Sequence, residues 1–135
     1  MLIFKSGKKS IVSYRETLTS ILKEMERKDA EIEGSIIVRT DGLILATALP
    51  EDIDGDIVAA MSASVFGVGA RVLEELGGGT LENAIIRGSN RIIMLVSVTP
   101  EVSLVAIAQK DANLGLMFVE MKRAADKIRE VLKKI

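Results

Sequence analysis

The sequence predicts an α/β (α+β) domain in which three helices cover one five-stranded, mostly antiparallel sheet, in the order α-β-β-α-β-β-β-α. Apolar residues recur at helical spacing near both ends of the chain and once in its middle. Two short apolar runs meet at Asp41-Gly42, and three longer runs are separated by turn-like tripeptides. We expect a three-layer sandwich with the first and last helices on one face of the sheet and the middle helix on the other.

Composition fits one globular domain, expected over residues 13–135, with residues 1–12 as an N-terminal extension. Eighteen basic and nineteen acidic residues give a net charge of −1, so charge offers no basis for binding nucleic acid or an anionic membrane. The chain has no cysteine, which excludes disulfides and thiolate metal sites. The apolar residues Met1 to Phe4 are too few for a signal peptide, and we expect a cytoplasmic protein without membrane insertion.

The first helix is expected to begin at Ser13, where Ser13-Tyr14-Arg15-Glu16 has the form of a capping box. Its apolar stripe consists of residues at helical spacing, namely Tyr14, Leu18, Ile21, Leu22 and Met25. Residues 1–12 stay open between a tail and a short additional strand, with Ile11 and Val12 the best placed to pack.

A β-hairpin follows and is the clearest local feature. Its strands are expected over residues 35–40 and 43–49. Asp41-Gly42 joins them as a two-residue turn, which needs positive φ at both central positions. A polar connection over residues 50–55 then leads to the middle helix.

The middle helix, expected to end near Leu76 at Gly77-Gly78-Gly79, contains fourteen consecutive uncharged residues, Ile57 to Ala70. Because a membrane span needs roughly 20 apolar residues, this run indicates a helix buried in protein. A helical wheel gathers large aliphatic side chains on one face, which we assign to the core: Ile57, Met61, Val65, Val68, Val72 and Leu76.

The opposite face of this helix carries small residues around one aromatic ring. We expect it to pack against a second copy of the chain. The expected interface residues on this helix are Ala59, Ala63, Phe66, Gly67, Ala70 and Leu73. The alternative is that a second helix of the same chain covers this face.

Three further strands are expected over residues 81–87, 91–98 and 102–109. The nearly unbroken apolar runs 92–96 and 104–108 indicate central strands buried on both sides. The strand 81–87 begins this meander and is expected at an edge of the sheet, where Ala84 and Ile86 would join the dimer interface. A last helix follows, with the apolar stripe Leu114, Met117, Phe118, Met121, Ala125, Ile128, Leu132 and Ile135.

Over residues 13–135 the chain resembles the roadblock family of dynein light chains and prokaryotic GTPase regulators. The resemblance rests on the order of elements, the hairpin around Asp41-Gly42, the alanine-rich helix over residues 58–65, and Asn113-Leu-Gly-Leu116, which opens the last helix. It implies a profilin-like sandwich. It also implies a homodimer, built through the second helix and the third strand, that regulates Ras-like small GTPases or scaffolds larger assemblies.

No motif for catalysis, metal binding or cofactor binding is complete in the sequence. Ser6-Gly7-Lys8-Lys9-Ser10 lacks the first glycine of a P-loop. The alternating acids Asp52, Asp54 and Asp56 lack the glycine and glutamate positions of a calcium loop. The chain has no histidine, so its serines lack the usual activating base. We therefore expect no enzyme activity, no metal and no cofactor.

Three functions are compatible with these features. The first is a dimeric, non-catalytic regulator or scaffold that binds a Ras-like small GTPase. The second is a structural adaptor subunit of a larger complex, and the third is a small-ligand-binding module. For a GTPase, the candidate contacts are Arg71, Arg87 and Arg91, which lie near the expected interface, although solvated surface charge is the simpler interpretation of all three.

Overall fold

The computed structural model describes residues 11–135 and confirms the predicted order of helices and strands. The elements are α1 (Ile11–Lys28), β1 (Ile32–Arg39), β2 (Ile44–Ala48), α2 (Gly55–Glu75), β3 (Asn83–Arg87), β4 (Arg91–Thr99), β5 (Val102–Gln109) and α3 (Leu114–Leu132). The strands form one sheet in the order β2-β1-β5-β4-β3, and every neighbouring pair is antiparallel. The fold class is therefore as predicted.

Helix α1 begins two residues earlier than expected. Ile11 and Val12 belong to α1, and Ser13 lies inside the helix instead of capping it. The capping-box prediction is therefore wrong. The expectation of a tail or strand over residues 1–10 lies outside the described residues.

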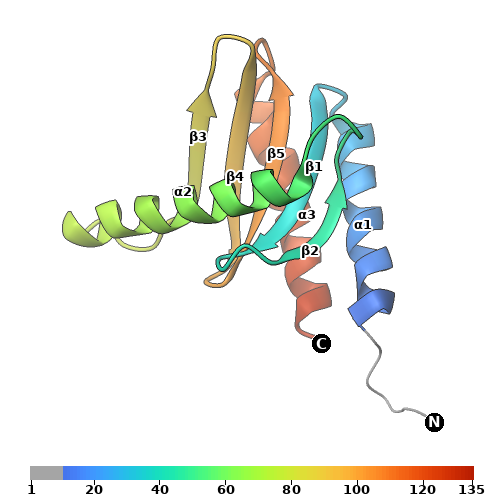
Figure 1. Cartoon of the computed structure of the whole chain (residues 1–135), viewed down its shortest axis with the longest axis horizontal. Helices are drawn as coiled ribbons and strands as arrows, with labels where there is room; N and C mark the ends of the chain where they lie inside the picture. Colours follow the sequence, from blue (N-terminus) through green and yellow to red (C-terminus); the bar gives the residue numbers. More distant parts are fainter. Residues whose placement is uncertain (1–10) are drawn as a thin grey trace.

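The sheet is covered on both faces. Helices α1 and α3 lie side by side on one face, and α2 crosses the strands on the other (Figure 1). Adjacent strand residues alternate between these two layers. In β1, Ile37 packs in the core beneath α1 and α3, whereas Ile36 and Val38 pack beneath α2. Because both faces of the sheet are buried, the sequences of the central strands are nearly unbroken apolar runs.

The turn between β1 and β2 differs from the prediction. The backbone N–H of Gly42 donates to the Arg39 carbonyl at 2.9 Å, and the N–H of Arg39 donates to the Leu43 carbonyl at 2.9 Å. These bonds enclose three residues, Thr40 to Gly42, instead of two. Gly42 has a φ of +91°, the left-handed conformation that closes three-residue hairpin loops.

The ends of α2 and α3 follow from local sequence. The Asp54 carboxylate accepts hydrogen bonds from the N–H groups of Asp56 and Ile57 at 3.0 and 3.3 Å and so caps the start of α2. Gly77, with a φ of +65°, follows α2 as expected. The Asn113 side chain accepts from the N–H of Leu116 at 3.0 Å and caps α3. Asp54 and Asp56 thus lie at a helix start, where negative charge is favoured.

Candidate interaction surface

The outer face of α2 is a row of large aliphatic side chains in contact with solvent. Met61 and Val68 are each 64% exposed, and the same face carries Ile57, Val72 and Leu76. These residues were predicted to face the core, so that assignment is wrong. Contiguous apolar surface of this kind is typical of protein interaction sites.

The inner face of α2 carries the small residues instead. Ala59 is fully buried and Phe66 is 8% exposed, and both pack in the second core with Ile36, Leu95 and Val105 of the sheet. Small side chains let the helix approach a sheet face that already carries large ones, which is the physical reason for this orientation. Ala59 and Phe66 therefore have almost no surface for a second copy of the chain. The covering element is the sheet, not the helix considered as the alternative.

Four other predicted interface residues on α2 lie between these two faces or on the solvent side. Ala63 is half-buried, and Ala70 and Leu73 are half-buried against the second core. Gly67 is exposed, and a Cβ added to it would meet nothing within 4 Å. It lines a shallow hollow of about 290 Å³ on the outer face, together with Val68, Arg71, Val72 and Glu75.

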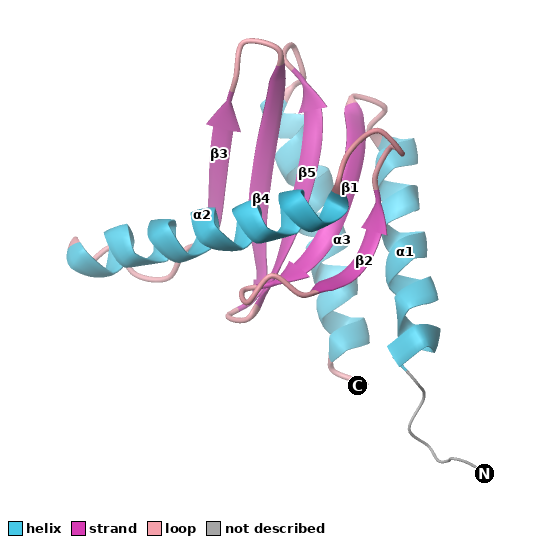
Figure 2. Cartoon of the chain, viewed as in Figure 1, coloured by secondary structure: helices cyan, strands magenta, loops and turns pink. Residues whose placement is uncertain are grey.

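Strand β3 is an edge of the sheet, as predicted. Ile85 and Ile86 are 47% and 45% exposed, whereas Ala84 is half-buried against the second core. Figure 2 shows that the C-terminal half of α2 extends past β3. The apolar face of α2 and the free edge of β3 therefore lie on the same side of the molecule.

The three candidate arginines are dispersed around this side of the sheet. Arg71 is on α2 and lies 4.0 Å from the Glu74 carboxylate, with both side chains 77% exposed. Arg87 is exposed at the end of β3. Arg91 begins β4, and its Nε lies 3.3 Å from Glu33 Oε1. Because both side chains of the Arg71–Glu74 pair are this exposed, the pair contributes little to stability, and Arg71 remains free to reorganise around a partner.

No group of three or more acidic residues suited to a metal ion occurs within residues 11–135. Helix α2 is long and apolar enough to span a membrane by length and composition alone. In this fold its inner face packs on the sheet, and an N-cap and a glycine turn bound it.

A comparison with known families identifies the domain, since residues 19–108 match the Roadblock/LC7 domain. The chain belongs to the Roadblock/LC7 domain family. The uncharacterized protein MJ0310 of Methanocaldococcus jannaschii is 38% identical to it over 109 residues, covering 81% of this chain and 94% of that protein.

Solved structures show the same roadblock fold. Myxococcus xanthus MglB superposes with a TM-score of 0.82 at 20% identity, covering 88% of this chain and 97% of the other. Profilin II of Acanthamoeba castellanii superposes with a TM-score of 0.55 at 15% identity, covering 87% and 97%. The expected profilin-like sandwich is therefore confirmed.

A signal in the sequence could have assigned the faces of α2 correctly. Arg71 and Glu75 lie on the same side of the helical wheel as Val68 and Val72. Charges at the C-terminal end of a helix mark its solvent side, because an unpaired charge is costly to bury. The positions of these two charges therefore indicate the solvent face of α2 better than the size of its aliphatic residues does.

Proposed function

We propose that this chain is a dimeric, non-catalytic regulator or scaffold that binds a Ras-like small GTPase in the cytoplasm. The observation that carries the proposal is the solvent-exposed aliphatic face of α2 beside the free edge of β3. Membership of the Roadblock/LC7 domain family supports it, because the roadblock resemblance implies both a dimer and a GTPase partner.

In the proposed dimer, both copies of the chain would contribute the same surface to the contact. A two-fold axis near β3 would place β3 beside its own copy in antiparallel orientation and extend the sheet. The outer faces of the two α2 helices would then meet. We place Met61, Val68 and Val72 at the centre of this contact, with Gly67 and Ile86 beside them. The hollow at Gly67 provides a place for a side chain of the second copy.

The GTPase would bind the assembled dimer. Arg71 lies on α2 beside the proposed contact, and Arg87 and Arg91 flank the turn between β3 and β4. Each is a candidate to meet an acidic surface or a phosphate. Because the chain has no histidine and no cysteine, we propose that it acts on the GTPase by binding and not by chemistry of its own.

Two measurements test the proposal in turn. Light scattering should give twice the 14.6 kDa mass of the chain. Binding should then be measured to small GTPases of the same organism, loaded with GDP or with a GTP analogue, and binding to either form supports the proposal. A dimer that binds no GTPase in either state but purifies in a stable complex with other proteins is an adaptor subunit. A monomer at all concentrations removes the proposed interface.

A further inference from the structure

The side of β3 that faces away from α2 is exposed in the part of the chain that the structure describes. Ile85 pairs with Met94 of β4, and Arg87 pairs with Ile92. Both partners lie in the core beneath α1 and α3, so Ile85 and Arg87 point to that side of the sheet. Helix α3 packs on β4 and β5, and Figure 1 shows β3 beyond them at the edge. Ile85 and Arg87 are therefore in contact with solvent.

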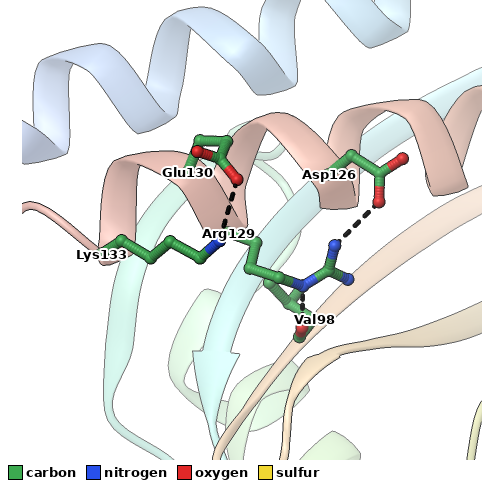
Figure 3. A network of polar contacts seen from close by, with 5 residues as sticks. All are labelled: Val98, Asp126, Arg129, Glu130 and Lys133. Carbon is green, nitrogen blue, oxygen red and sulfur yellow. Dashed lines mark hydrogen bonds and ion pairs between the residues drawn. The ribbon is translucent and has the colours of Figure 1, made fainter.

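The side of α3 that faces β3 adds an aromatic ring to this surface. Arg129 marks that side of the helix, because its Nε donates to the Val98 carbonyl of β4 at 2.7 Å (Figure 3). Phe118 lies eleven residues earlier, about three full turns, so it points the same way. Its ring is exposed, and the Lys122 Nζ lies 6.0 Å from the ring centroid.

Phe118 and Ile85 lie at the same level of the sheet. Helix α3 follows β5 after a short turn and so runs in the direction of β4, because β4 and β5 are antiparallel. From Arg129 back to Phe118 the helix rises about 16 Å, the length of about five strand residues. The same distance back along β4 from Val98 ends beside Met94, the partner of Ile85.

Four exposed residues thus form one patch, the α3-side patch: Ile85, Arg87, Phe118 and Lys122. Its two apolar side chains are flanked by its two cations. Among residues 11–135, no carboxylate lies within 4.0 Å of either cation. Elsewhere on α3 the cations are paired, since Arg123 lies 3.6 Å from a carboxylate oxygen and Arg129 2.8 Å from another. The patch therefore attracts negative charge beside an apolar surface.

The proposed dimer would double this patch and build a trough around it. The trough exists only in that dimer, so this step rests on the proposed function. Ile85 is the central residue of β3, and pairing of β3 with its own copy would bring the two Ile85 side chains together on one face. The axes of the two α3 helices, each over β4 and β5, would then lie about four strand spacings apart, roughly 19 Å. Packed helices lie about 8–10 Å apart, so the trough has room for one helix.

We propose that this trough binds one amphipathic helix of a partner protein, with carboxylates along both edges of its apolar stripe. The apolar stripe would contact Ile85 and Phe118 of both copies, and the carboxylates would lie near Arg87 and Lys122. The trough spans the two-fold axis, so one helix would serve two chains. A helix with basic edges would meet like charges and bind weakly.

A labelled peptide tests the proposal on the full chain. The probe is a fluorescein-labelled peptide of about 18 residues, or five helical turns, with leucines at helical spacing and glutamates on either side. Its matched control has lysine in place of each glutamate. In fluorescence anisotropy, we expect saturable binding of the glutamate peptide at one peptide per two chains, and at least tenfold weaker binding of the lysine peptide. One peptide per chain would overturn the shared trough.

Charge reversal in the patch shows where the peptide binds. Lys122→Glu should weaken binding of the glutamate peptide at least tenfold and strengthen binding of the lysine peptide. Arg123→Glu makes the same change in charge at the next residue of α3, on the side toward α1, and should leave both affinities within twofold of the parent. Equal effects of the two substitutions, or binding of the glutamate peptide that survives Lys122→Glu, would overturn the proposal.

Light scattering of the same samples separates the trough from the dimer that forms it. Phe118→Asp changes the patch without touching β3, so it should keep the dimer mass and bind the glutamate peptide at least tenfold more weakly. Lys122→Glu serves alone if circular dichroism shows that Phe118→Asp does not fold. A monomeric parent protein would remove the proposed dimer and the trough together. A dimeric parent that does not bind the glutamate peptide would overturn the trough and leave the dimer standing.

Discussion

Phe66 is the one aromatic side chain of α2, and it points into the space between the helix and the sheet. Its neighbours along the inner face, Ala59 and Ser62, are small and buried. The ring therefore fills the volume that these residues leave. It contacts a core that includes Leu81 and Leu95, so its contribution is to the fold of one protomer.

We expect Phe66→Ala to lower the free energy of unfolding by about 3 kcal/mol or more, because it leaves a cavity beneath α2. Urea denaturation followed by circular dichroism measures this loss. Phe118→Ala is the matched control, since Phe118 is 36% exposed on α3 and should cost much less. A loss that disappeared at high protein concentration would instead place Phe66 between two copies of the chain.

Glu26 is a second residue whose environment has a measurable consequence. The buried Ser35 hydroxyl donates to its carboxylate at 2.5 Å, linking α1 to β1. Burial raises the pKa of Glu26 above 4.5, although the Ser35 hydrogen bond and the charge of Lys23 act in the opposite direction.

This shift predicts the pH dependence of stability. The pKa of Glu26 is higher in the folded state than in the unfolded state, so the folded state takes up a proton more readily. The contribution of Glu26 to stability is fully present below pH 4.5 and is lost as the pH rises through the folded pKa. Glu26→Gln keeps an acceptor for Ser35 and carries no charge. We expect it to be at least as stable as the parent at pH 7, with the advantage shrinking by pH 5 in urea titrations. An advantage that grew toward pH 5 would contradict the raised pKa.

At the scale of elements, the two edges of the sheet are built differently. The pairing of β2 with β1 shifts register between Ile37 and Val38, so that Leu45 is an extra, bulged residue. The Arg15 side chain on α1 donates to the Leu45 carbonyl at 3.1 Å. Strand β3 pairs with β4 in unbroken register. The bulge and the arginine obstruct the β2 edge, whereas the β3 edge is free to pair.

We therefore expect Arg15→Ala to permit association through β2. In light scattering, its average mass should rise with concentration beyond that of the parent protein, because two open edges allow chains to add end to end. Arg27→Ala is the matched control on the same helix, since Arg27 pairs with Glu24 at 3.9 Å and its side chain is 73% exposed. If both variants keep the mass of the parent, Arg15 does not protect the edge.

The outer face of α2 gives a sharper test of the proposed dimer. Val68→Arg would place a charge at the centre of the contact, where burial without a partner costs several kcal/mol. We expect a folded monomer in light scattering and a native circular dichroism spectrum. Val119→Arg makes the same change at a 48% exposed site on α3 and should keep the mass of the parent. Dissociation in both variants would point to a general effect of charge.

Much of the fold follows from local signals in the sequence. Strand β5 and the start of β4 were predicted to the residue, because the turn-like tripeptides Gly88-Ser89-Asn90 and Thr99-Pro100-Glu101 precede them. The faces of α2 could not be predicted from aliphatic size, since both sides of the helix are apolar. The Arg15–Leu45 contact has no local signal at all, because it joins residues 30 positions apart.

At the scale of the whole molecule, a dimer that buries its exposed apolar surface by association should become more stable as the protein concentration rises. If folding and association are coupled, a tenfold increase in protomer concentration adds about 1.4 kcal/mol by mass action. For a domain of this size, we expect the thermal midpoint to rise by about 2–4 °C per tenfold concentration. Calorimetry over a hundredfold range of concentration measures this slope. Val68→Arg should abolish it and Val119→Arg should keep it, which separates loss of the dimer from simple destabilisation. A midpoint independent of concentration in the parent protein, together with a monomer mass, would mean that another protein covers the outer face of α2.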